Sequence, residues 1–215
     1  MTVPAASQAF LEDLCAAAPV VPVLTVPDAA SAAPLARALV AGGLPALEVT
    51  LRTPAALAVI AAMRDAAPQA WVGAGTLRTP ADVAEAKAAG AVFGVSPGAT
   101  PALLDAAEAA ELPLLPGAAT ASEVMALAER GLLLQKFFPA AAAGGRPLLK
   151  SLAAPLTDVR FCPTGGIDAA SAPDWLALPN VICVGGSWVA PSDAVASGDW
   201  DRVEALAAEA AALRP

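Results

Sequence analysis

Residues 46–66 read ALEVTLRTPAALAVIAAMRDA, and this stretch contains one complete unit of the pattern that decides the fold. From Ala46 to Arg52, polar and apolar residues alternate, which predicts a strand. Thr53 and Pro54 then introduce an Ala-rich segment of helical character that reaches Ala66. A threonine accepts hydrogen bonds from the first free amides of a helix, and proline suits its first turn. The stretch therefore predicts a strand followed directly by a helix.

The same unit recurs along the whole chain. Segments of strand character occupy residues 20–26, 46–52, 70–76, 91–96, 112–115, 132–138, 159–163 and 181–184. Helical segments occupy residues 29–41, 54–66, 80–89, 101–111 and 122–130, with a leading helix at 7–17 and a closing one at 200–213. Thr79-Pro80 and Thr100-Pro101 repeat the helix start, and Gly42-Gly43, Gly90 and Gly131 are placed to end helices with a left-handed residue.

Eight strand–helix alternations with short connections predict a parallel sheet with right-handed crossovers. Closed on itself, such a sheet is a (β/α)8 TIM barrel, here with an extra N-terminal helix. An open doubly wound sheet is the alternative, but eight units without a nucleotide fingerprint favour closure. No domain boundary stands out, so we expect a single barrel domain over residues 1–215.

Composition excludes several classes of protein. Hydrophobic residues make up 57% and charged residues 15%, which is typical of a folded chain. A formal net charge of −8 argues against a nucleic-acid partner, because phosphate backbones require a basic face. The apolar runs are too short to span a membrane. The first ten residues lack a signal-peptide pattern, so we expect a cytoplasmic protein.

The residue types present limit the chemistry further. Histidine is absent, which excludes histidine-ligated metals and every histidine-based acid/base scheme. The three cysteines, Cys15, Cys162 and Cys183, are far apart in sequence and fit neither a disulfide framework nor a zinc pattern. We therefore expect no metal and no cofactor, and chemistry carried by lysine, carboxylates, arginine, hydroxyls and backbone groups.

Lys136 is the first candidate, because active sites of such barrels lie at the carboxyl ends of the strands. It lies in LLLQKFFP (132–139), where period-two alternation puts it on one face with Leu132, Leu134 and Phe138. Burial favours the neutral amine, which is the nucleophile that a Schiff base needs. A snorkelling lysine or half of a structural ion pair is the alternative.

The strand at 46–52 supplies a partner. Glu48, Thr50 and Arg52 share one face, and burying them costs several kcal/mol unless they pair. A glutamate beside a neutral lysine can transfer protons, and an arginine at the strand end can bind a carboxylate. The alternative is a buried salt bridge, formed by Glu48 either with Arg52 or with a lysine, that only holds the strands of the barrel in register.

Other strand ends carry hydroxyls and turns. Thr76 ends GAGT (73–76), and Pro97 follows Ser96 at the end of the next strand. The last two strands end in PTGGI (163–167) and VGGSW (184–188). Paired glycines after these strands match the usual phosphate site of the fold, so we expect a phosphorylated substrate.

With these motifs in order, the chain resembles the 2-keto-3-deoxy-6-phosphogluconate (KDPG) aldolases, which overlap with the 4-hydroxy-2-oxoglutarate (KHG) aldolases. The matching segments are VVPV (20–23), LEVTLRT (47–53), VGAGT (72–76), VSPG (95–98), KFFPA (136–140), RFCPTGGI (160–167) and GGSW (185–188). After KFFPA, relatives often carry an acidic and then a polar residue, whereas this chain has AAAGG (141–145).

The resemblance implies a role for each matching residue. Lys136 would form the Schiff base and Glu48 would be the general acid/base. The pyruvyl carboxylate would be held by Arg52 and Thr76, within pocket walls formed by Pro97 and Phe138. Thr164 would influence the stereochemistry of carbon–carbon cleavage. The phosphate would bind at Gly165, Gly166, Gly186 and Ser187.

The resemblance also implies a metal-independent homotrimer that cleaves KDPG to pyruvate and glyceraldehyde 3-phosphate in the Entner-Doudoroff pathway. The nearer alternatives are another Schiff-base lyase acting on 4-hydroxy-2-oxoglutarate or on the galactonate epimer of KDPG. A catalytically silent oligomeric barrel is the distant one. A sugar-phosphate isomerase would use this fold and an anion site, but no iminium-forming lysine.

Overall fold

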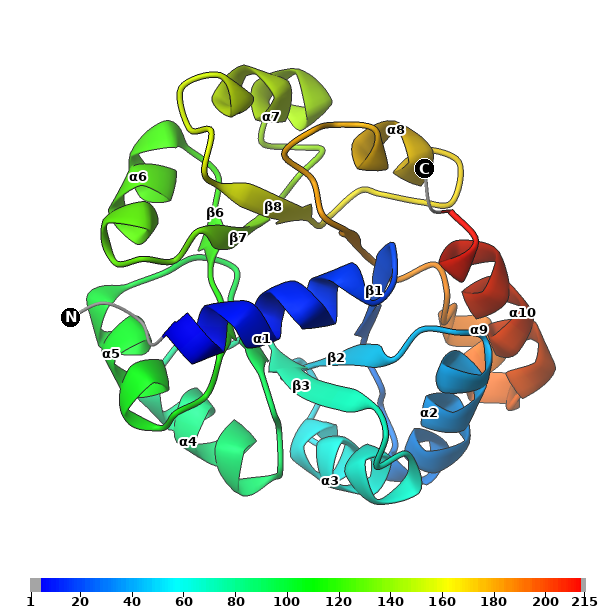
Figure 1. Ribbon diagram of the computed structural model, residues 1–215. Helices are drawn as coiled ribbons and strands as arrows, with labels where there is room; N and C mark the ends of the chain where they lie inside the picture. The colour runs from blue at the N-terminus through cyan, green and yellow to red at the C-terminus, as the bar shows by residue number, and fades with distance from the viewer. Residues whose placement is uncertain (1–4, 214–215) are drawn as a thin grey trace.

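A computed structural model describes residues 5–213 of the chain (Figure 1). Residues 1–4 and 214–215 lie outside the described residues. They include both ends of the expected domain and part of the segment that was searched for a signal peptide. The strands are β1 (Val20–Leu24), β2 (Ala46–Thr50), β3 (Trp71–Gly75), β4 (Gly94–Val95), β5 (Leu114–Leu115), β6 (Gly117–Ala118), β7 (Leu134–Phe137), β8 (Arg160–Pro163) and β9 (Val184–Gly186).

Helices alternate with these strands and surround them in Figure 1. They are α1 (Ala5–Ala16), α2 (Ala32–Ala41), α3 (Ala56–Ala66), α4 (Pro80–Ala88), α5 (Pro101–Ala109), α6 (Ala121–Glu129), α7 (Gly145–Ala153), α8 (Ala172–Leu176), α9 (Ser192–Ser197) and α10 (Trp200–Ala211), with a 3-10 turn, η1 (Ala29–Ser31).

The strands close into a parallel barrel with eight positions, each of which we call a stave. One ladder runs β5-β4-β3-β2-β1-β9 and a second runs β6-β7-β8. Parallel bridges from Phe161 to Val181 and from Thr164 to Gly185 join the two ladders on one side. On the other side β5 and β6 are one stave, interrupted at Pro116, which has no N–H to donate. The backbone N–H of Lys136 donates to the Pro116 carbonyl over 2.8 Å and continues the ladder. The predicted TIM barrel is confirmed, and the open doubly wound sheet is wrong.

The main core lies between the barrel and its helices. Leu47 and Val49 of β2 are fully buried in one cluster with Val59, Ile60 and Met63 of α3. Each such side chain contributes about 1.5–3 kcal/mol when it leaves water. The alternation of β2 therefore sends apolar residues outward to the helices and leaves Glu48 to face the barrel interior.

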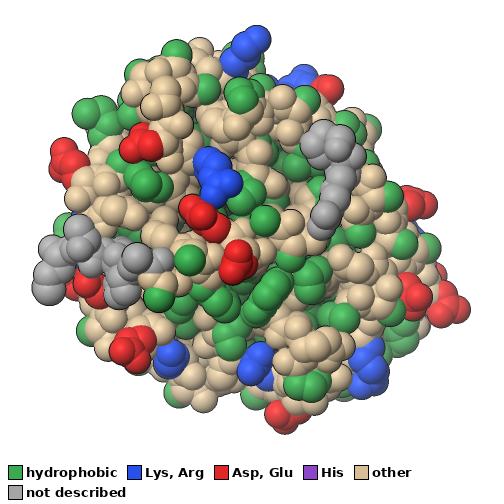
Figure 2. All heavy atoms as spheres, in the orientation of Figure 1, with side chains coloured by type: hydrophobic (Ala, Val, Ile, Leu, Met, Phe, Trp, Pro, Cys, Tyr) green, Lys and Arg blue, Asp and Glu red, His purple; other side chains and the backbone are tan. Residues whose placement is uncertain are grey.

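The extra N-terminal helix is also confirmed, and it covers the amino end of the barrel, where α1 crosses in front of the strands in Figure 1. Leu11, Leu14 and Cys15 are buried in the barrel interior with Phe93 and Leu134. The Gln8 side-chain oxygen accepts hydrogen bonds from the amides that begin β7, at Leu133 and Leu134. On this covered face, acidic and basic side chains are scattered among hydrophobic ones (Figure 2). Because α1 covers the amino end of the barrel, the carboxyl end is the open end at which a site can lie.

Several predicted boundaries were wrong, most of them at strand ends. The strand predicted to reach Arg52 ends at Thr50, because the Arg52 N–H donates to the Thr50 carbonyl over 2.8 Å and turns the chain. The strand predicted at 181–184 begins only at Val184 and runs through the glycines to Gly186, which pair with β1. The strand predicted at 91–96 keeps ladder pairing only over Gly94–Val95.

The helix signals were mostly right. The hydroxyls of Thr79 and Thr100 accept from the amides of Asp82 and Leu103, as predicted. Thr53 instead donates its hydroxyl hydrogen to the Val26 carbonyl over 2.8 Å, and α3 begins two residues later than expected, at Ala56. Gly43, Gly90 and Gly131 take the predicted left-handed conformation, with φ of 91°, 90° and 79°. Gly42 does not, because its φ is −72°.

The three cysteines are far apart in sequence but converge inside the barrel, where all are buried free thiols. Hydrogen bonding with Cys15 first, then with Cys162, together with burial, raises the pKa of Cys183 well above its ordinary value. Within residues 5–213, no group of three or more His, Cys, Asp or Glu side chains is arranged to hold a metal ion. No helix of this described part is long and apolar enough to cross a membrane.

Candidate active site

Lys136 and Glu48 form a buried pair inside the barrel. In β7, Gln135 points outward and donates its side-chain amide to the carbonyls of Val124 and Leu132, so Lys136 points inward. Its Nζ lies 3.3 Å from Glu48 Oε1, and the two side chains are only 6% and 4% exposed. Removing one member of such a pair leaves the other charge buried alone, which typically costs about 3–5 kcal/mol. The sequence predicted both residues and their common environment.

Phe138 lies beside this pair. Its ring centroid is 5.3 Å from Lys136 Nζ, within the range of a cation–π contact. The residue follows β7 directly, is half-buried and also lines the cleft at the carboxyl ends of the strands. This placement agrees with the predicted pocket wall.

Arg52 and Thr76 come together at the ends of β2 and β3. Arg52 Nε donates to Thr76 Oγ1 over 3.3 Å. Thr76 has a φ of 65°, a left-handed conformation that β-branched residues rarely adopt and that costs about 1–3 kcal/mol. Arg52 is exposed, so its guanidinium is accessible from the open end. A planar guanidinium beside a hydroxyl is suited to a carboxylate.

Thr50 does not join the pair, although it shares the predicted face with Glu48. Its hydroxyl donates to the Leu24 carbonyl over 2.9 Å and lies 3.0 Å from the Thr25 hydroxyl. The hydroxyl is therefore satisfied by β1, and its role is to tie the ends of two strands. The alternative pairing of Glu48 with Arg52 is not formed, whereas the pairing with Lys136 is.

A cleft of about 220 Å³ opens at the carboxyl ends of the strands. Its lining includes six of the predicted site residues, which come from four different staves: Arg52, Phe138, Thr164, Gly165, Gly166 and Ser187. Lys136 and Glu48 lie deeper, inside the barrel, and Pro97 lies against Gly117 on the neighbouring stave. Gly186 is buried at the end of β9, directly before Ser187. The structure thus gathers the predicted residues at one end of the barrel.

The glycine turn after β8 and the glycines that end β9 present backbone rather than side chains. Gly165 and Gly166 have φ of 104° and 73°, so an L side chain at either would be strained. The loop after β7 is fastened to this turn, because the amides of Ala140 and Ala141 donate to the carbonyls of Thr164 and Gly165. Bare, fixed amides at the ends of these two strands can approach an anion closely.

A larger hollow of about 580 Å³ adjoins the cleft and shares Val23, Thr25 and Ser187 with it. Asp193 lies in its lining and accepts a hydrogen bond from Arg202 over 2.7 Å, which lowers the pKa of that carboxyl. Val23, Thr25 and Ile167 line the mouth without having been predicted. Thr25 had a usable signal, since it is a polar residue near the end of a predicted strand.

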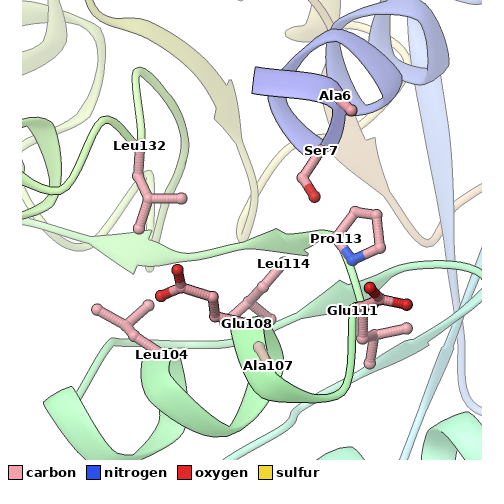
Figure 3. A pocket seen from close by; sticks show the side chains of 10 residues that line it. Ala6, Ser7, Leu104, Ala107, Glu108, Glu111, Pro113, Leu114 and Leu132 are labelled. Atoms are coloured by element: carbon pink, nitrogen blue, oxygen red, sulfur yellow. The ribbon is translucent and has the colours of Figure 1, made fainter. Parts of the chain in front are cut away.

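Another hollow, of about 230 Å³, lies near the amino end, between α1, α5 and β5 (Figure 3). Its lining is mostly apolar and carries the carboxylates of Glu108 and Glu111, with no lysine or arginine among the lining residues. An anion would meet like charge there, whereas the cleft at the carboxyl end is lined by Arg52.

Comparisons with known proteins identify the family of this chain. The KDPG and KHG aldolase family matches residues 11–206. The chain is 50% identical over 201 residues to a 2-dehydro-3-deoxy-phosphogluconate aldolase of Pseudoalteromonas atlantica, which covers 94% of each chain. It is 50% identical over 199 residues to the KHG/KDPG aldolase of Escherichia coli K12, which covers 93% of each.

Solved structures agree as well. The KDPG aldolase of Zymomonas mobilis ZM4 with 3-phosphoglycerate superposes with a TM-score of 0.91 at 48% identity, covering 96% of this chain and 97% of that one. The KDPG aldolase of Legionella pneumophila, with pyruvate captured as a covalent carbinolamine, gives 0.91 at 44% identity, covering 94% and 98%. On the matched span, the identity and the fold, this chain belongs to the KDPG and KHG aldolase family.

Proposed function

We propose that this protein is a class I aldolase that reversibly cleaves KDPG to pyruvate and glyceraldehyde 3-phosphate through a Schiff base on Lys136. The observation that carries the proposal is the Lys136–Glu48 pair, 3.3 Å apart and almost fully buried beneath the open end of the barrel. A carboxylate at this distance can take the proton of the Lys136 ammonium, which leaves the neutral amine that acts as the nucleophile. Relatives that are KDPG aldolases support the same chemistry.

In the proposed mechanism, the neutral Lys136 amine attacks the C2 ketone of the keto acid and forms a carbinolamine. Glu48 transfers the protons that let water leave and the iminium form. The iminium draws the electron pair of the C3–C4 bond, the C4 hydroxyl passes its proton to the Glu48 carboxylate, and the aldehyde departs. Glu48 then returns this proton to C3 of the enamine left on Lys136, and hydrolysis releases pyruvate. The iminium acts as the electron sink throughout, so the cycle requires neither a metal nor a cofactor.

The substrate carboxylate is proposed to lie against Arg52 and Thr76, which meet at the cleft. Pro97 and Phe138 would form the walls around the pyruvyl group, and Thr164 would face the C3–C4 bond. Holding the reacting atoms in one orientation contributes several kcal/mol to such a reaction.

The substrate phosphate is proposed to bind at the turns after β8 and β9, through Gly165, Gly166, Gly186 and Ser187. The fold usually binds phosphate after its last two strands, and the proposal is supported by the left-handed backbones of Gly165 and Gly166, which line the cleft there. A relative solved with 3-phosphoglycerate supports an anion of this kind.

A second candidate is cleavage of 4-hydroxy-2-oxoglutarate, which the KHG/KDPG aldolase of E. coli supports. A third is the galactonate epimer, supported by the KDPGal structure at 26% identity and a TM-score of 0.79. The phosphate turns favour KDPG over the first, and steady-state rates on all three substrates separate them. A silent scaffold would have no use for a buried lysine–glutamate pair under an open cleft.

Borohydride reduction in the presence of pyruvate, followed by peptide mass spectrometry, tests the covalent step. We expect a reduced pyruvyl adduct on Lys136 alone. Lys87 and Lys150 are exposed on α4 and α7 and serve as internal controls. Absence of the adduct, or an adduct spread over all three lysines, would contradict the proposal.

We also propose that the protein is a single-domain, cytoplasmic homotrimer. A designed protein cage made by fusing symmetric oligomeric domains superposes with a TM-score of 0.77 at 26% identity, which supports a symmetric assembly. Sedimentation equilibrium checks this: we expect about three times the 21.1 kDa mass of one chain. A monomeric mass would contradict it.

A further inference from the structure

Three of the proposed site residues lie directly against an inward-facing glycine of the next stave. Glu48 on β2 is the first. A Cβ added to Gly75 on β3 would lie 2.2 Å from Glu48 Oε1 and 2.6 Å from its Cγ. The carboxylate that pairs with Lys136 therefore occupies the space that a side chain at residue 75 would fill.

The same relation holds at two other places around the barrel. A Cβ on Gly185 of β9 would lie 2.2 Å from Thr164 Oγ1, on the stave before it. A Cβ on Gly117 of β6 would lie 2.4 Å from the carbonyl carbon and oxygen of Pro97, which follows β4. These contacts are far inside the approach that real Cβ atoms show, so an alanine at any of the three positions would displace its neighbour.

Backbone conformation does not explain these glycines. None of the three has a φ in the left-handed region, so an alanine is permitted by the backbone at each position. The remaining explanation is steric, because a side chain at each position would occupy space on the inner wall of the barrel that its neighbour already fills. Two of the three neighbours, Glu48 and Thr164, are themselves buried polar side chains, and Glu48 is paired with the amine.

We propose that Gly75, Gly117 and Gly185 are positioning residues that hold Glu48, Pro97 and Thr164 around Lys136 by leaving room for them on the adjoining stave. The inference rests on the proposed Schiff-base function. Gly75 is the strongest case, because proton transfer between Glu48 and the reacting atoms requires hydrogen-bond distance. A displacement of about 1 Å can lower a rate by about 100-fold.

The test compares Gly75→Ala with Gly73→Ala. Gly73 lies on the same strand and the same face, two residues nearer the amino end, and its added Cβ would meet the Phe93 ring at 2.4 Å instead of a site residue. Both variants crowd the barrel interior, so both are expected to lower the melting temperature. Only Gly75→Ala is expected to lower kcat, by about 100-fold, with KM changed far less.

A purely structural role would leave proton transfer unchanged, so proton transfer is the second readout. Solvent deuterium exchange into the methyl group of pyruvate reports enamine protonation, and its pH profile is expected to shift in Gly75→Ala and to match the parent in Gly73→Ala. Removing the carboxylate removes the contact, so Gly75→Ala is expected to lower the melting temperature far less in a Glu48→Ala background than in the parent.

Each outcome decides the inference. If Gly75→Ala keeps the parent's kcat and pH profile, the positioning role is wrong. If Gly75→Ala does not fold, Gly75→Ala/Glu48→Ala is expected to fold, since the added Cβ no longer meets a carboxylate, and equal failure of both overturns the inference. A parent protein that forms no pyruvyl adduct would overturn the proposed function instead, which keeps the two failures distinct.

Discussion

Each end of the barrel carries an ion pair between a strand residue and a residue of another element, and the two pairs are alike in distance but not in surroundings. At the amino end, Arg160 of β8 lies 3.0 Å from Glu12 of α1, with side chains 43% and 45% exposed. At the carboxyl end, Lys136 of β7 lies 3.3 Å from Glu48, with exposures of 6% and 4%. Water screens the first pair and leaves it worth little, whereas burial makes each charge of the second depend on the other.

This difference separates stability from chemistry within one fold. The amino end is filled by apolar side chains and closed by α1, so changes there act on folding. The carboxyl end holds charges, glycines and a cleft, so changes there act on the reaction. The predictions below test this division.

The largest effect is expected for Lys136→Met. Without the amine no Schiff base forms, so kcat for KDPG cleavage should fall by at least about 10⁴-fold. Glu48 would also be left buried without its partner, so the variant should lose stability. The measurement is steady-state pyruvate release together with borohydride trapping. Lys150→Met, on the exposed face of α7, is the control and should behave like the parent.

Glu48→Gln should lower kcat by about 10²–10⁴-fold, because an amide of nearly the same shape cannot transfer protons. The Lys136 amine remains, so the pyruvyl adduct should still form, more slowly. Single-turnover trapping with pyruvate measures that rate. Trapping as fast as in the parent would show that Glu48 does not act in carbinolamine or iminium formation.

At the other end, Leu14→Ala should destabilise the protein by about 2–5 kcal/mol, because the side chain is fully buried between α1 and the strands. Urea unfolding measures the change. The kcat of the folded protein should stay near that of the parent. A loss of kcat much larger than the loss of folded protein would show that the two ends are coupled.

Much of this division was predictable from sequence, because the period-two alternation of β2 and β7 puts Glu48 and Lys136 each on one face of its strand. Closure of the barrel then brings the two side chains together across its interior, 3.3 Å apart. Contacts between residues distant in sequence were not predictable. Cys15, Cys162 and Cys183 converge only after α1 has covered the barrel. Gly75 is an ordinary turn residue in sequence, and its contact with Glu48 exists only across two staves.

Strand ends were the least predictable, since they depend on hydrogen bonds beyond the strand. Thr53 carries the same signal as Thr79 and Thr100, but its hydroxyl is taken by the Val26 carbonyl of the preceding loop. The stave interrupted at Pro116 likewise required knowledge of both neighbours. The sequence pattern indicates on which face of a strand a side chain lies. It does not indicate which other hydrogen-bond acceptor lies close enough to bind that side chain.

The smallest effect is expected for Arg160→Met, which removes the exposed ion pair of the amino end. Exposed pairs contribute about 0–1 kcal/mol, so urea unfolding should show a change within that range, and kcat should not change. Salt gives a second measure, because screening removes an exposed pair: the small difference between parent and variant should vanish at about 1 M salt. If Arg160→Met lowered stability or kcat as much as Lys136→Met, the difference in exposure would not explain the difference between the two ion pairs. The small expected effect matters because the distance between the charges is nearly the same at both ends, so only burial can account for a large difference in outcome.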